Sequence, residues 1–171
     1  MTDEYLAAMR ELWTSSAPTF AGKYTQFSEV HFEPKPTQKP HPPIWVGGHS
    51  PAALRRAAAL GSAWHPINRP VEEISAGRAE IARLCKAGGR AVPPTVTMRI
   101  DTRVLQAGEG APAPIHGGSM LAGEPDELVD RIGELAAAGV EHLVLEFLAA
   151  DAAELEEQMD LFVERVRPGV A

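Results

Sequence analysis

Two segments of the sequence share one pattern: a glycine, a proline at an expected helix start, an apolar stripe and a closing glycine. They read GHSPAALRRAAALG at residues 48–61 and GEPDELVDRIGELAAAG at residues 123–139. Proline fits the first turn of a helix and glycine commonly ends one, so each segment predicts a short helix with fixed ends. A short apolar segment precedes the first helix, at residues 44–46, and another follows the second helix, at residues 140–148. Strand and helix in alternation predict a parallel sheet with right-handed crossovers.

Hydrophobic periodicity and turn residues divide the rest of the chain in the same way. Strands are expected at 44–46, 62–65, 95–105 and 140–148, and helices at 2–15, 51–60, 71–87, 125–138 and 152–167. We predict that Thr2, Ser50 and Asp151 cap their helices and that Pro168 ends the last one.

Two stretches are expected to be irregular. Residues 17–43 end in PKPTQKPHPP, which suits neither a helix nor a central strand. We predict an ordered surface loop there, anchored by Tyr24, Phe27 and Phe32. Residues 107–123 are rich in glycine and proline and are predicted to form a loop.

Composition narrows the functional classes. The 171 residues carry a formal net charge of −7, with a pI near 5.4. Nucleic acids and anionic membranes call for clustered basic residues, so neither is an expected partner. No apolar stretch approaches the length of a membrane span, no signal peptide is recognisable, and there is one cysteine. We therefore expect a cytoplasmic protein with a small-molecule substrate.

The ordered series of motifs resembles the luciferase-like monooxygenase family of flavin and deazaflavin enzymes. The similar segments are YLAAMRELWT followed by FAGKYTQF, then PPIWVGGHS, and later MLAGEPDELVDRIGELAAAGVEHLVLEF. Within the family the chain is most similar to the group that uses coenzyme F420. The resemblance implies a deazaflavin cofactor, with FMN as the alternative. It also implies family chemistry of hydride transfer or of oxygenation through a flavin peroxide.

The family fold is a (β/α)8 barrel, for which about 250 residues are typical. By resemblance, residues 1–171 form a single luciferase-like domain, truncated at its N-terminus, that holds the last four β/α units. The family's catalytic residues lie mostly in the first half, so none is assigned to this chain. One family motif is altered, since Gly-Asp-Gly-Trp is here Gly61-Ser62-Ala63-Trp64.

The candidate cofactor-binding segment follows the strand at 44–46. It comprises Val46, Gly47, Gly48, His49 and Ser50. Paired glycines let a ligand approach the backbone closely, and the N-terminus of the next helix favours phosphate. By resemblance, the phosphate of the cofactor lies here. The alternative is a tight turn with Ser50 as a helix cap only. Arg55 and Arg56 add charge near the phosphate or lie on a solvated helix face.

Other side chains have two interpretations each. Trp45 and Trp64 each lie in the core or flank the cofactor ring, and the core is favoured for Trp45. His65 and Asn68 line the pocket mouth or lie on the surface.

The remaining candidates are weaker. The six histidines show no metal-binding spacing, so no metal site is predicted. Cys85 is expected to be buried and inert, and His116 to Ser119 to form a mobile loop. The five glutamates at 134, 141, 154, 156 and 157 are expected to be solvated charges.

Half a barrel leaves two open sheet edges, which tend to pair with other strands. We expect closure by a second copy, closure by a complementary half-barrel chain, or an origin as part of a longer product. The leading hypothesis is a portion of a luciferase-like oxidoreductase. The alternative is a non-catalytic half-barrel remnant or subunit that retains at most cofactor-phosphate binding.

Overall fold

The computed structural model describes residues 1–170. These residues form two compact units, Met1–Ile44 and a second unit that starts at Trp45. The sequence predicts one domain over the same stretch.

The first unit consists of a helix and a hairpin. Helix α1 (Thr2–Thr14) has Met1 as its N-cap, so the prediction that Thr2 caps it was wrong. Strands β1 (Phe20–Ala21) and β2 (Gln26–Phe27) pair in an antiparallel hairpin inside the segment predicted to be irregular. Phe20 and Phe27 stack across the hairpin with ring centroids 5.9 Å apart. This cross-strand aromatic contact explains why so short a hairpin forms.

Glu4 joins the hairpin to α1. One of its carboxylate oxygens accepts hydrogen bonds from the backbone N–H groups of Tyr24 and Thr25, at 2.6 and 3.0 Å. The side chain of Tyr24 is half exposed and does not anchor the loop as predicted, whereas Phe27 and Phe32 are partly buried.

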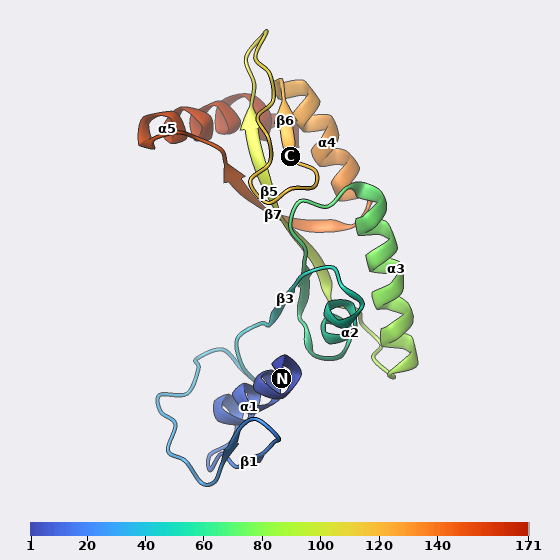
Figure 1. The fold of residues 1–171 in the computed structure, drawn as a ribbon, viewed down its shortest axis with the longest axis vertical. Helices are drawn as coiled ribbons and strands as arrows, with labels where there is room; N and C mark the ends of the chain where they lie inside the picture. The colour runs from blue at the N-terminus through green and yellow to red at the C-terminus, as the bar shows by residue number, and fades with distance from the viewer. Residues whose placement is uncertain (171) are drawn as a thin grey trace. The chain divides into compact units, whose positions relative to one another are not determined.

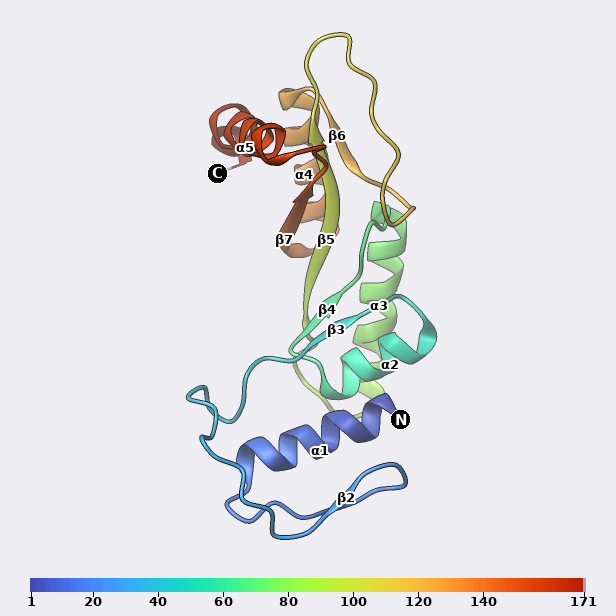
Figure 2. The same cartoon turned by 60° about the vertical axis from the view of Figure 1, so that its left-hand side comes forward.

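The second unit is built on a parallel sheet, as the sequence predicts. Its strands are β3 (Trp45–Gly47), β4 (Ala63–His65), β5 (Thr95–Val104), β6 (Leu121–Gly123) and β7 (Val140–Phe147). The order is β3-β4-β5, with β7 on the far edge of β5 and β6 beside the end of β5 on the edge that β4 occupies earlier (Figure 2). Strand β6 was missed because glycine and proline dominate residues 107–123, and only three residues pair.

The helices follow their strands. They are α2 (Pro51–Leu60), α3 (Val71–Ala87), α4 (Pro125–Ala137), α5 (Ala152–Leu161), a π-helical turn (Phe162–Val166) and α6 (Arg167–Val170). Ser50 and Asp151 cap α2 and α5 as predicted, because their side chains accept N–H bonds of the first turn. Pro168 does not end the last helical segment, which continues directly after the π-helical turn as α6 to Val170.

The core lies between the sheet and the helices, with α3 and α4 beside the strands in Figure 1. Strand β5 alternates, and its inward side chains Val96, Met98 and Ile100 are at most 2% exposed. Trp64 is in register with Val96 and contacts α3 at Gly77, where an added Cβ would lie 2.2 Å from the indole ring. Leu121, Leu128, Ile132 and Leu135 continue this core beneath α4.

The opposite face of the sheet carries polar and aromatic side chains. On β5 these are Thr97, Arg99, Asp101 and Arg103, and their register partners on β7 include His142, Val144 and Glu146. Trp45 lies on this face and is 46% exposed, so the prediction that it is a core residue was wrong. A sheet with helices on one face and an open polar face is a partial (β/α) barrel. Among residues 1–170, none of the helices has the length and apolar character to cross a bilayer.

Candidate functional site

The turn from β3 into α2 holds the predicted cofactor-binding segment. Val46 is buried, and the residues from Gly47 to Ser50 are exposed. Gly48 has a φ of +91°, a left-handed conformation that side chains other than glycine rarely adopt. Ser50 Oγ accepts the Ala53 N–H at 3.2 Å, with Pro51 in the first turn. The turn therefore sets both the end of the strand and the start of the helix.

Trp64 supports this turn from the next strand. Its indole Nε1 donates to the carbonyl oxygen of Gly48 at 2.7 Å, and its side chain is 1% exposed. Of the two interpretations of Trp64, the structure supports the core one. The tryptophan of the altered Gly61–Trp64 motif thus holds the glycine turn even though the family's acidic residue is absent.

The exposed glycines leave room for a ligand beside the helix N-terminus. A Cβ added at Gly47 would have as its nearest neighbour only the His65 carbonyl oxygen, at 3.7 Å. The first N–H groups of α2 and the positive end of its dipole favour a phosphate there. Arg55 is exposed on α2, and Arg56 is partly buried. The turn thus places exposed glycine backbone beside the N-terminus of a helix.

His65 lies on the open face of the sheet. Its Nδ1 is 2.7 Å from Thr97 Oγ1, and its ring lies 5.2 Å from the ring of Trp45. Partial burial, then the nearby His142 and Arg99, lower the pKa of His65 below its ordinary value. The surroundings of His65 therefore favour the neutral imidazole over the charged form.

Asn68 is fully buried, unlike the pocket-mouth or surface position considered from the sequence. Its backbone is left-handed, with φ +52°, and its Oδ1 accepts the N–H of Asp101 at 2.9 Å. The Asn68 carbonyl accepts the Ser119 N–H at 3.0 Å. Asn68 thus connects β5 to the loop that contains residues 116–119.

A polar cluster that the sequence analysis did not identify lies beyond Asn68. Asp101 is 0% exposed, and its Oδ2 accepts the Ile115 N–H at 2.6 Å. The loop thereby brings His116 to Arg99, with 3.0 Å between His116 Nε2 and Arg99 Nη2. Arg99 also pairs with Glu146 of β7. The sequence signal was the row of polar residues at alternate positions of two otherwise apolar strands.

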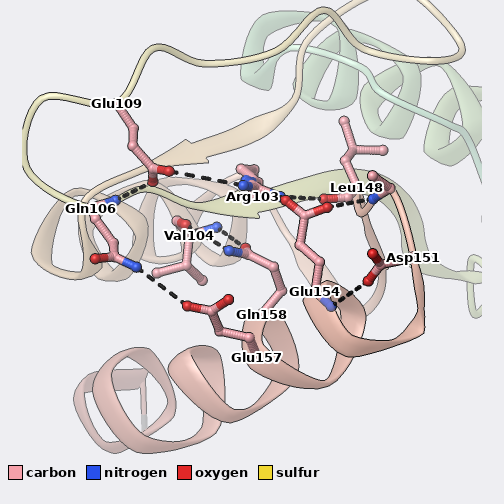
Figure 3. Close-up of polar contacts among 10 residues, drawn as sticks. Arg103, Val104, Gln106, Glu109, Leu148, Asp151, Glu154, Glu157 and Gln158 are labelled. Carbon is pink, nitrogen blue, oxygen red and sulfur yellow. Dashed lines mark hydrogen bonds and ion pairs between the residues drawn. The ribbon is translucent and has the colours of Figure 1, made fainter.

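Arg103 lies at the centre of another cluster of polar side chains, at the carboxyl ends of β5 and β7 (Figure 3). Its Nη1 donates to the Leu148 carbonyl at 2.9 Å and to Glu154 at 2.6 Å. The N–H of Ala150, and then Arg103, lower the pKa of Glu154. Glu154 was predicted to be a solvated charge, and this pairing corrects that prediction. Gln158 of α5 satisfies both backbone groups of Val104, at 2.8 and 3.1 Å.

Comparison with known proteins places the chain in a family. The model of the luciferase-like monooxygenase family matches residues 1–107. An FMNH2-dependent dimethylsulfone monooxygenase of Pseudomonas putida is 33% identical over 91 residues, which are 53% of this chain and 25% of the relative. A protein of the same name from Pseudomonas fluorescens (strain Pf0-1) is 25% identical over 211 aligned positions, covering 98% of this chain and 56% of the relative.

The fold agrees with this comparison. A solved F420-dependent secondary alcohol dehydrogenase, in complex with an F420-acetone adduct, superposes with a TM-score of 0.80 at 20% identity. The match covers all of this chain and 61% of that structure. The aligned segments cover between 25% and 61% of the three proteins named here, so each of these proteins is longer than the part that this chain matches. This chain belongs to the luciferase-like monooxygenase family.

Proposed function

We propose that this chain is the cofactor-phosphate-binding portion of a luciferase-like oxidoreductase that acts on a small-molecule substrate. The observation that carries the proposal is the exposed, left-handed glycine turn at Gly48, held by Trp64 and followed by the Ser50-capped helix α2. Backbone N–H groups and a helix dipole at the end of a parallel strand suit a phosphate. Family membership supplies the cofactor class, a reduced flavin or deazaflavin.

Coenzyme F420 is the proposed cofactor, with FMN as the alternative. The motif order is most similar to that of the F420 group, and the solved alcohol dehydrogenase contains F420. The curated Pseudomonas relatives, in contrast, are named as FMNH2-dependent. Both cofactors carry a ribityl phosphate, so the Gly47–Ser50 segment fits either.

The residues of this chain would bind and orient the cofactor. The Gly47-Gly48 backbone and the first turn of α2 would hold the phosphate, with Ser50 at the edge of that site. Trp64 would keep the turn in place from the core side. When bound, the cofactor supplies a hydride or, as FMN, reacts with oxygen. The open polar face of the sheet would line the side of the site that faces the barrel interior.

A partner for the open sheet edges is part of the proposal. The outer edges of β3 and β7 have no neighbouring strand among the described residues. Unpaired strand edges favour association. A second copy of the chain, or a chain that supplies the complementary half-barrel, would close the barrel.

The test is a titration of the purified chain with F420 and with FMN, followed by fluorescence and calorimetry. We expect saturable binding of one cofactor, at least tenfold weaker in Gly48→Val. Gly133→Ala is the matched control, because Gly133 lies in α4 with open space around it. Circular dichroism must show that each variant is folded. A folded chain that binds neither cofactor would contradict the proposal and favour a non-catalytic half-barrel.

A further inference from the structure

The buried carboxylate of Asp101 has an oxygen without a partner. Asp101 is 0% exposed, and while its Oδ2 accepts the Ile115 N–H, its Oδ1 has no hydrogen-bond partner among the described residues. Leaving a buried carboxylate oxygen unsatisfied is costly, so such a group usually has a ligand or a cation nearby. Asp101 therefore offers a buried carboxylate oxygen that can accept a further interaction.

Two further ligand-type side chains converge on Asp101. One ligand atom each from Asp101, His116 and Glu146 lie within 4.8 Å of one another. Glu146 is the register partner of Asp101 on β7, and His116 comes from the loop after β5. Glu146 Oε2 is also buried, and it forms an ion pair with Nη2 of Arg99.

The tautomer of His116 suits a cation ligand. His116 Nε2 lies 3.0 Å from Nη2 of Arg99, and a guanidinium only donates hydrogen bonds. Nε2 is therefore the acceptor nitrogen, and its lone pair is directed at Arg99 Nη2, the group that a bound cation would replace. His116 Nε2 also lies 3.6 Å from Glu146 Oε2, so the two donor atoms share one small volume.

We infer that Asp101, His116 and Glu146 form a binding site for a divalent transition-metal ion. Two carboxylate oxygens and one imidazole nitrogen are a donor set typical of Mn²⁺, Fe²⁺ or Zn²⁺, whereas Mg²⁺ and Ca²⁺ prefer oxygen alone. Metal–ligand bonds of about 2.1 Å place ligand atoms at most ~4.2 Å apart. A separation of up to 4.8 Å requires only a small movement of the His116 loop. This inference does not depend on the proposed cofactor.

Arg99 is the group that the ion would replace. Its guanidinium now neutralises Glu146 and contacts His116, and its side chain is 32% exposed, so it can turn toward solvent. The charges of Asp101, Glu146 and Arg99 sum to about −1. Without Arg99 the two carboxylates sum to about −2. Removal of Arg99 should therefore strengthen metal binding, which a purely structural ion pair does not predict.

The test is calorimetric titration of the chelator-treated chain with ZnCl2 and MnCl2, with MgCl2 as the comparison. We expect one saturable site per chain for Zn²⁺ or Mn²⁺, and binding of Mg²⁺ at least tenfold weaker. His116→Gln should weaken binding at least tenfold, and Arg99→Gln should strengthen it by a similar factor. His116 lies on an exposed loop, so this variant keeps the test valid even if Asp101→Asn fails to fold.

His31→Gln is the control for adventitious binding, because His31 is exposed and belongs to the other unit. It should leave the affinity unchanged. The inference is overturned if neither Zn²⁺ nor Mn²⁺ saturates a site, if His116→Gln binds as tightly as the wild type, or if Arg99→Gln weakens binding.

Discussion

The indole nitrogen of Trp64 donates a hydrogen bond to the carbonyl oxygen of Gly48, 2.7 Å away and 16 residues earlier in the chain. This bond joins β4 to the turn after β3. The tryptophan ring is also the surface on which Gly77 of α3 packs. One buried side chain thus fixes the candidate phosphate turn and the position of the neighbouring helix.

Replacing Trp64 with phenylalanine tests the role of this bond. Trp64→Phe keeps a buried aromatic ring but removes the donor and leaves a small cavity. We expect a loss of about 2 kcal/mol in the free energy of unfolding. Cofactor affinity should fall in the same variant. Trp45→Phe is the control, since Trp45 is 46% exposed. Urea denaturation measures the free energy of unfolding of both variants. Equal losses in Trp64→Phe and Trp45→Phe would contradict the role given to Trp64.

A second prediction concerns the backbone of Gly48. Its φ of +91° is unfavourable for any side chain, so Gly48→Ala should destabilise the fold by about 1 kcal/mol. Gly133→Ala should do the opposite by about 0.5–1 kcal/mol, because that glycine is in a helix interior with no atom near its Cβ position. Thermal unfolding of the pair measures both effects. A stabilised Gly48→Ala protein would show that the turn does not need glycine.

The sequence predicted correctly those helices whose ends carry a capping residue, a proline or a glycine. The range of α3 was predicted to the residue, and Ser50, Pro51 and Gly139 marked helix ends correctly because capping and left-handed glycine act within one turn. The candidate turn at Gly47–Ser50 was found for the same reason. Family membership was predicted from the order of these motifs.

Features that depend on distant contacts were not predicted. Leu121 is fully buried in β6, but the partner that makes this strand is β5, about 20 residues earlier. Asp101 and Glu146 become neighbours only through the register of β5 and β7. Trp45 was assigned to the core because tryptophan is usually buried, yet half of a barrel leaves its inner face open.

The Arg103 cluster gives a third prediction, on stability. Arg103→Met removes the bonds to the Leu148 carbonyl and to Glu154, where the two charged side chains are only 18% and 29% exposed. We expect a loss of about 2 kcal/mol in the free energy of unfolding. The matched control is Arg83→Met, because Arg83 pairs with Glu80 at 65% exposure. Solvent screens that surface pair, so its loss should have a much smaller effect. Equal effects in chemical denaturation would refute the importance of Arg103.

The last prediction concerns the pH dependence of stability at His65. Burial, His142 and Arg99 lower its pKa in the folded state below the value of about 6.5 found in an unfolded chain. The unfolded state therefore binds a proton more readily than the folded state. His65 contributes its full share of stability above the unfolded pKa, and this share is lost as the pH falls through the folded pKa.

We expect the free energy of unfolding to fall between about pH 7.5 and pH 5.5 in the wild type, and to fall less in His65→Gln. Urea denaturation at several pH values, followed by circular dichroism, measures the two slopes. His31→Gln should keep the wild-type slope, because His31 is exposed and belongs to the other unit. The neutral state assigned to His65 is wrong if His65→Gln and the wild type lose stability in parallel on acidification.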